Sequence, residues 1–77
     1  MIGQPTLSVR GRDKNRVFII VKILDDNFVE IADGRTRKIS KPKRKKLKHL
    51  KLLDLPPVNV PQSDRELYRM IKELSLS

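Results

Sequence analysis

The 77-residue chain has no cysteine and no tryptophan, one histidine and only three aromatic residues. The lack of cysteine excludes disulfides, thiolate zinc sites and cysteine nucleophiles, and His49 alone cannot form a histidine cluster. The longest apolar run, Val17–Val21, is far shorter than the roughly 18–20 residues that span a bilayer. The N-terminus has no signal-peptide core. These absences predict a single cytoplasmic domain without a metal site or cofactor.

Acidic residues are missing from one segment, Arg35–Lys51, which contains ten lysines and arginines. The whole chain has 18 Lys+Arg, 9 Asp+Glu and a formal net charge of +9, so this segment accounts for the basicity. Surfaces that serve only solubility usually mix both signs, whereas an unmixed run is typical of phosphate binding. Six to eight phosphate contacts would give a slope of log K against log salt near −4 to −6, at about 0.7 per contact. A membrane surface is the less favoured partner, because Pro42 interrupts an internal run.

Features of an enzyme are lacking as well. No nucleophile–base pair or phosphate-binding loop is recognisable, and the chain is predicted to be non-catalytic. Asp25 and Asp26 are adjacent, so at a strand end they point to opposite sides, and together with Asp33 they are better explained as turn formers. Base-stacking platforms need exposed aromatics, but Phe18 and Phe28 lie in segments expected to supply the core. This pattern predicts recognition of RNA backbone and shape.

Two β-branched segments predict a central hairpin. Val17–Leu24 is favoured as a central strand, and Phe28–Ala32 as its return strand, with Val29 and Ile31 on one face. The Asp33-Gly34 pair that follows is a strong turn signal. In the polar turn before the hairpin, Gly11 and Asn15 are the residues best able to take a positive φ.

Shorter segments predict the remaining strands. Thr6–Arg10 alternates polar and apolar residues, which places Leu7 and Val9 inward. Thr36–Ser40 is expected to form a third short strand, and Leu47–Leu53 fits either a closing strand, which is favoured, or a helical turn. Five short strands joined by tight turns indicate a small antiparallel barrel, because closure removes exposed edges.

The C-terminal part predicts a proline-rich strap and a helix. Ser63 followed by Glu66 forms a capping box, with Asp64 adding negative charge at the helix start. An apolar stripe then recurs at helical spacing: Leu67, Met70, Ile71 and Leu74. A three-turn helix is marginal alone in water, so the stripe is expected to cover a barrel opening or to bind a partner. The expected organisation is a flexible lead-in (1–5), a barrel (6–53), a strap (54–62) and a helical C-terminal segment (63–77).

An ordered set of short motifs carries a family resemblance. The motifs are Gly11–Lys14 (GRDK), the apolar run Val17–Val21, Ala32–Gly34 (ADG), Arg37, Lys41–Lys43 (KPK) and Lys48–Leu50 (KHL). In this order they resemble KOW-motif proteins, found among NusG-type transcription factors and large-subunit ribosomal proteins. More narrowly, they resemble small bacterial KOW proteins related to the archaeal and eukaryotic ribosomal L14e/L6e/L27e group. The pattern usually has glycine where this chain has Asn15, which tolerates the same left-handed conformation.

The resemblance implies an SH3-like barrel that binds RNA, most often ribosomal RNA. Together with the charge pattern it predicts a mainly β, SH3-like (KOW) barrel of about five strands with a C-terminal α-helix, acting in translation on the ribosome. The expected RNA-binding residues are Arg10, Arg12, Lys14, Asn15, Arg16, Arg35, Arg37, Lys38, Lys41, Lys43, Arg44, Lys45, Lys46, Lys48 and His49. The alternative is a protein-interaction module that binds the transcription or translation machinery through its helix stripe.

Overall fold

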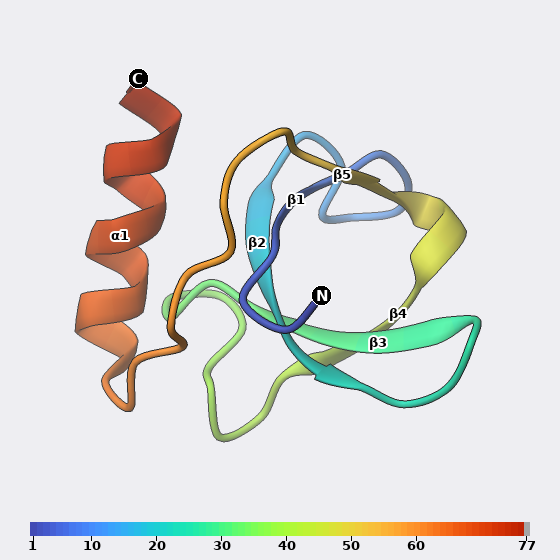
Figure 1. Ribbon diagram of the computed structural model, residues 1–77, viewed down its shortest axis with the longest axis horizontal. Helices are drawn as coiled ribbons and strands as arrows, with labels where there is room; N and C mark the ends of the chain where they lie inside the picture. Colours follow the sequence, from blue (N-terminus) through green and yellow to red (C-terminus); the bar gives the residue numbers. More distant parts are fainter. Residues whose placement is uncertain (77) are drawn as a thin grey trace.

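The computed structural model describes residues 1–76 as a curled antiparallel sheet with one helix beside it (Figure 1). The elements are β1 (Pro5–Ser8), β2 (Val17–Ile23), β3 (Phe28–Ala32), β4 (Lys43–Lys46), the 3-10 helix η1 (Leu47–His49), β5 (Leu50–Leu52) and α1 (Asp64–Leu76). The five strands lie in the order β4-β3-β2-β1-β5. Since η1 joins the two outermost strands, the sheet curls into a small barrel. The predicted fold class, a mainly β SH3-like barrel with a C-terminal helix, is confirmed.

The β2–β3 hairpin forms as predicted and supplies two separate apolar clusters. Phe18 and Ile20 of β2 pack with Val29 and Ile31 of β3 inside the barrel. Because side chains alternate along a strand, Ile19 points to the opposite face, where it meets the helix. The hairpin therefore builds the barrel core and the platform for α1 at the same time.

The side chains of β1 that face the barrel interior are not the predicted ones. Thr6 and Ser8 are completely buried, whereas Leu7 is half-buried and Val9 is exposed. Both buried hydroxyls have acceptors: Thr6 Oγ1 donates to the carbonyl of Lys51 at 3.1 Å, and Ser8 Oγ to that of Arg10 at 3.1 Å. A satisfied hydroxyl is tolerated in a core, so apolar alternation alone indicated the wrong face.

The strand predicted at Thr36–Ser40 does not form. The Asp33 carboxylate accepts hydrogen bonds from the backbone N–H groups of Arg35 (2.9 Å) and Arg37 (2.8 Å), and the Ile39 N–H donates to Asp64 at 2.7 Å. The two carboxylates thus bind backbone N–H groups that would otherwise pair with a neighbouring strand. The fourth strand is instead the cationic segment Lys43–Lys46, which pairs with β3.

The ambiguous segment Leu47–Leu53 contains both predicted structures in succession. Residues Leu47–His49 form a 3-10 turn, and Leu50–Leu52 then pair with β1 as the closing strand. Leu50 is buried in the barrel core, with Leu47 packed against it.

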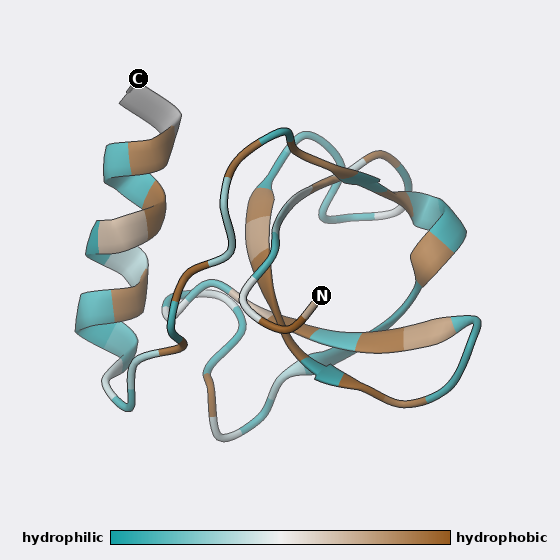
Figure 2. Cartoon of the chain, viewed as in Figure 1, coloured by the Kyte–Doolittle hydropathy of each residue, from teal (hydrophilic) through white to brown (hydrophobic). Residues whose placement is uncertain are grey.

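Helix α1 begins at the predicted cap and packs against the outer face of β2, not over a barrel opening (Figure 1). The Glu66 N–H donates to Ser63 Oγ at 3.4 Å. Leu67 and Ile71 are buried against Ile19 and Ala32, and Figure 2 shows the apolar side of α1 turned towards the sheet. Burying two such side chains contributes roughly 1.5–3 kcal/mol each.

The helix stripe is therefore used within the chain. With Leu67 and Ile71 buried and Leu74 packed on the same cluster, the stripe is not available as the partner-binding surface of the alternative hypothesis. Met70, the fourth predicted stripe residue, is half-buried. Within residues 1–76, α1 and η1 are too short or too polar to cross a bilayer.

The strap and the N-terminal residues hold each other in place. Gly3 donates to the Ile20 carbonyl at 2.7 Å and accepts from the Val58 N–H at 2.9 Å. The expected lead-in is thus hydrogen-bonded from Gly3 onward. Val58 and Val60 of the strap also pack against the cluster beneath the helix. We propose that lead-in, strap and helix fold together with the barrel as one unit.

Candidate nucleic-acid interface

The Gly11–Arg16 loop is a tight turn that holds its basic side chains outward. Gly11 (φ 85°) and Asn15 (φ 72°) both adopt the left-handed conformation, as predicted. Backbone hydrogen bonds close the loop, including Asn15 N to Ser8 O at 2.8 Å. Asn15 therefore adopts the left-handed conformation that glycine takes at no steric cost.

Asp13 is the one acidic residue of this loop, and it links three segments of the basic surface. Its side chain is 5% exposed and accepts a hydrogen bond from Lys43 Nζ of β4 at 2.5 Å, while Arg37 lies at 3.7 Å. The turn around Asp13 is closed by backbone hydrogen bonds, which leaves its carboxylate for these cations. Burial alone would raise the pKa of Asp13, but the Lys43 hydrogen bond and the charges of Lys43, Arg37 and Lys45 outweigh it and hold the pKa below its ordinary value.

Strand β4 divides the cationic run between two faces. Lys43 and Lys45 point towards the Gly11 loop, where Lys45 is 7% exposed and its Nζ donates to the Arg10 carbonyl at 2.8 Å. Desolvation first, and then the charge of Lys43, lowers the pKa of Lys45. Arg44 and Lys46 alternate to the outer face. Lys43 and Lys45, predicted as RNA contacts, thus stabilise the loop that carries other cations.

The other residues predicted to bind RNA lie around the contacts that Asp13 makes with Lys43 and Arg37. Exposed are Arg10, Arg12, Lys14, Asn15, Arg16, Arg35, Lys38, Lys41, Arg44, Lys46 and Lys48, whereas Arg37 and His49 are half-buried. The Asp13 contacts bring the Gly11 loop, the loop after β3 and β4 together. In the described part of the chain, the ion pairs of this surface all end on Asp13, which leaves most of the positive charge of the surface uncompensated.

Two helix residues extend this surface and were not predicted to belong to it. Arg35 donates to the Tyr68 hydroxyl at 2.8 Å, with its guanidinium 5.3 Å from the ring centroid, and Lys72 Nζ lies 5.8 Å from the same ring. Tyr68 and Lys72 line a cavity of about 260 Å³ together with Asn15 and Arg16. The available sequence signal is their spacing of four residues, which puts both on one flank of the helix.

His49 lies in positive surroundings at the end of η1. Partial desolvation first, and then the charges of Arg10, Lys46, Lys48 and Lys45, lower the pKa of His49. These surroundings favour the neutral imidazole in the free protein. A polyanion bound to these cations would favour the protonated form of His49.

Phe28 is a half-buried surface residue and not the core residue that its strand position predicted. Its ring lies on the outer face of β3, where the Arg44 guanidinium carbon is 3.9 Å from the ring centroid. Phe18, by contrast, is completely buried as predicted. The basic surface therefore includes the Phe28 ring, with Arg44 over it, in addition to the Tyr68 ring.

Two of the three acidic residues predicted to form turns, Asp25 and Asp33, do so. Asp25 accepts hydrogen bonds from the backbone N–H groups of Asn27 and Phe28 at 2.7 and 2.8 Å, and Asp33 closes the turn after β3 in the same way. Both carboxylates are used to shape loops.

Comparison with known proteins identifies archaeal ribosomal relatives. The eL14 protein of the large ribosomal subunit of Staphylothermus marinus is 34% identical over 77 residues, which cover 99% of this chain and 80% of that protein. The corresponding eL14 proteins of Desulfurococcus amylolyticus and Hyperthermus butylicus are 33% and 31% identical, over 99% and 97% of this chain and 80% and 78% of theirs. No protein-family model matches the chain.

These relatives support the broad resemblance and correct its narrow form. They belong to the ribosomal L14e group named by the motifs, but they are archaeal, so the comparison with small bacterial proteins is not supported. Their match runs through the strap and helix, beyond the motifs that suggested the resemblance. The chain therefore belongs to the eL14 family of large ribosomal subunit proteins, which are structural components of the ribosome and not enzymes.

Proposed function

We propose that the chain binds ribosomal RNA through a surface formed by the Gly11–Arg16 loop, the loop after β3, the outer face of β4 and η1. The observation that carries the proposal is Asp13, which is buried beneath three cationic segments and draws them together. Clustered positive charges repel one another in the free protein, so the cluster does not stabilise the fold. It does offer a preformed binding site to a partner rich in phosphates. As an eL14-family protein it would work on the cytoplasmic ribosome, in translation.

The contacts are expected to be mainly to phosphates. Arginine forks, such as those of Arg12 and Arg16, suit paired phosphate oxygens, and lysines add point charges. Such contacts fix position and orientation and carry little sequence information. Structured RNA would be recognised by its shape.

Salt dependence tests this proposal. We expect binding of the purified protein to a fluorescent fragment of large-subunit ribosomal RNA to weaken steeply between 50 and 300 mM KCl. The double variant Arg12→Gln/Lys14→Gln should bind about tenfold more weakly near 0.15 M salt, with a slope shallower by about 1.4, because two contacts at about 0.7 each are lost. Fluorescence anisotropy measures both quantities.

The matched control is Lys22→Gln/Arg69→Gln, which removes the same charge from two exposed residues outside the proposed surface. Lys22 pairs with Glu30, far along β2 from the loop, and Arg69 lies on α1. If both double variants lose affinity equally, net charge alone drives binding and the proposed surface is wrong. Sedimentation with ribosomal particles at low salt, and release at high salt, is expected for the wild type.

The histidine predicts how binding depends on pH. Because RNA would raise the lowered pKa of His49, binding should take up a proton, and affinity should rise as pH falls from 7.5 to 5.5. Stability should move the other way: a folded-state pKa below the unfolded value of about 6.5 means that protonation disfavours the folded state as pH falls. A His49→Gln variant should show a flatter affinity profile in the same anisotropy assay. An unchanged profile would remove His49 from the interface.

A further inference from the structure

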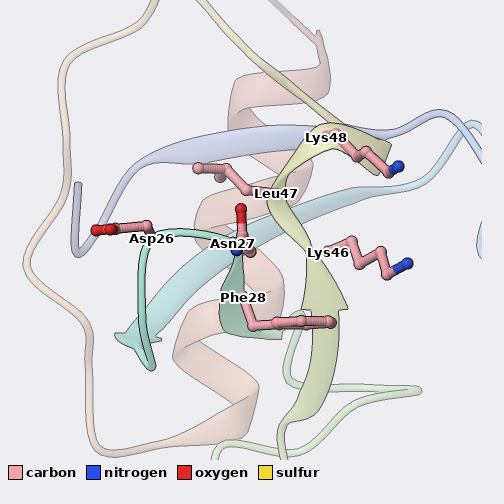
Figure 3. Close-up of a pocket in the computed structure, with 6 residues that line it drawn as sticks. All are labelled: Asp26, Asn27, Phe28, Lys46, Leu47 and Lys48. Atoms are coloured by element: carbon pink, nitrogen blue, oxygen red, sulfur yellow. The ribbon is translucent and has the colours of Figure 1, made fainter.

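A cavity of about 530 Å³ lies between the β2–β3 turn and the start of η1, beside the proposed RNA surface (Figure 3). Its lining residues are Asp26, Asn27, Phe28, Lys46, Leu47 and Lys48. Nothing in the proposed backbone recognition requires a cavity at this position. An aromatic ring and an aliphatic side chain suit the base of a nucleotide, and two lysines suit its phosphate.

The walls of the cavity are held by hydrogen bonds to the backbone. The Leu47 N–H donates to the Asn27 carbonyl at 2.8 Å, which joins η1 to the turn. On the other side, the Asp25 carboxylate fixes the N–H groups of Asn27 and Phe28. The cavity is therefore preformed, and a ligand would not have to order these segments.

The apolar surfaces form a slot suited to a planar group. Figure 3 shows the Phe28 ring on one side of the cavity and the Leu47 side chain on the other. Arg44 lies over the Phe28 ring but does not line the cavity, so it fixes the ring without filling the slot. Bases of single-stranded RNA stack on rings held in this way.

The two sides of the cavity carry opposite charges. The ammonium groups of Lys46 and Lys48 point to one side of the cavity, and the Asp26 carboxylate points to the opposite side (Figure 3). A phosphate is attracted to the lysine side and repelled from the Asp26 side. The Asn27 amide, between them, offers a donor and an acceptor to a base edge.

We propose that this cavity binds one unpaired, extruded nucleotide of the RNA, with its base between Phe28 and Leu47 and its phosphate on Lys46 and Lys48. The proposal rests on the proposed function and deepens it: the basic surface binds phosphates regardless of sequence, and the cavity selects RNA that can extrude a base. It predicts a preference for bulged over fully paired RNA.

The test compares two RNA hairpins that differ by one bulged nucleotide, each prepared with A, C, G or U at the bulge. Wild-type protein should bind the best bulged hairpin about tenfold more tightly than the paired one, because stacking on an aromatic ring is lost in the latter. Phe28→Ala should bind both hairpins equally, at the wild-type affinity for the paired one. The matched control, Tyr68→Ala, removes the other accessible aromatic ring: its affinity for both hairpins should fall together, because Arg35 loses a partner, while the ratio between them stays as in the wild type. Thermal unfolding confirms that each variant is folded.

The outcomes separate the two proposals. If neither hairpin is bound, the RNA-binding function itself fails. If both are bound equally by wild type and Phe28→Ala, RNA binding stands and the nucleotide cavity is overturned.

A covalent probe tests the occupant directly. Since the chain has no cysteine, an Asn27→Cys variant can carry one photo-crosslinker at the cavity rim. After assembly into ribosomes, crosslinking to an unpaired rRNA nucleotide supports the proposal. Crosslinking to a ribosomal protein and not to RNA would show that a protein side chain fills the cavity, and would overturn it.

Discussion

Replacing Asp13 with asparagine should lower the free energy of unfolding by about 2–3 kcal/mol. Removing one partner of a buried ion pair typically costs about 3–5 kcal/mol, and the 28% exposure of the Lys43 side chain reduces this expectation. Without the carboxylate, Lys43, Lys45 and Arg37 would repel one another around a buried site. Urea unfolding at pH 7 measures the change, and Asp54→Asn, an exposed carboxylate on the strap, is the control, with an expected effect within about 0.5 kcal/mol.

Acid should remove the effect of the Asp13 substitution. The folded state holds the pKa of Asp13 below its ordinary value, so its stabilisation is fully present above the unfolded pKa of about 3.9 and is lost as pH falls through the folded pKa. The difference between wild type and Asp13→Asn should therefore shrink below about pH 4. A difference that persists unchanged at pH 2 would mean that Asp13 acts through packing or hydrogen bonding and not through its charge.

The same variant distinguishes two explanations of the basic surface. Asp13→Asn raises the net charge by one, so a surface that works only by total charge should bind RNA more tightly. If Asp13 positions the Gly11 loop against β4, binding should weaken despite the added charge. We expect weaker binding, measured below the unfolding transition of the variant.

The sequence predicted the parts of the fold where local pattern and packing agree. The central hairpin, the positive φ of Gly11 and Asn15, and the capped helix have strong local signals, and each forms as expected. Two of the wrong predictions, the inward face of β1 and the strand at Thr36–Ser40, share one cause, which is polar side chains used inside the structure. Thr6 faces inward because its hydroxyl finds a carbonyl, and no apolar pattern can reveal that.

The candidate site was predictable in composition but not in arrangement. The run Lys43–Lys46 has no apolar alternation, so its role as β4 depends on pairing with β3 and on Asp13, thirty residues before Lys43. The sequence could not show that Lys43 and Lys45, predicted as RNA ligands, also bind within the protein, to Asp13 and to the Arg10 carbonyl. It also assigned Phe28 to the core, because strand propensity does not say which face of β3 is covered.

Replacing Gly34 with alanine is expected to have the largest effect, a destabilisation of about 3–4 kcal/mol. Gly34 has a φ of 79°, which costs a non-glycine residue about 1–2 kcal/mol. An added Cβ would also lie 2.1 Å from the backbone carbonyl oxygen of Asp64, at the start of α1. A backbone atom cannot rotate away, so the helix would have to move, and overpacking of this kind costs about 1–3 kcal/mol more.

Gly11→Ala is the matched control for this prediction. Its φ of 85° carries the same conformational penalty, but the nearest atom to the added Cβ is the flexible end of Lys45, at 3.3 Å. At about 4–8 °C per kcal/mol for a domain of this size, Gly34→Ala should lower the melting temperature by about 15–25 °C and Gly11→Ala by about 5–10 °C. Equal shifts would mean that α1 yields to the added methyl group at little cost. The Asp64 side chain also accepts a hydrogen bond from the Ile39 N–H. A displaced helix should therefore expose that amide to hydrogen exchange. Faster exchange at Ile39 in Gly34→Ala would show that Gly34 allows the helix to pack on the loop that carries Arg35 and Arg37.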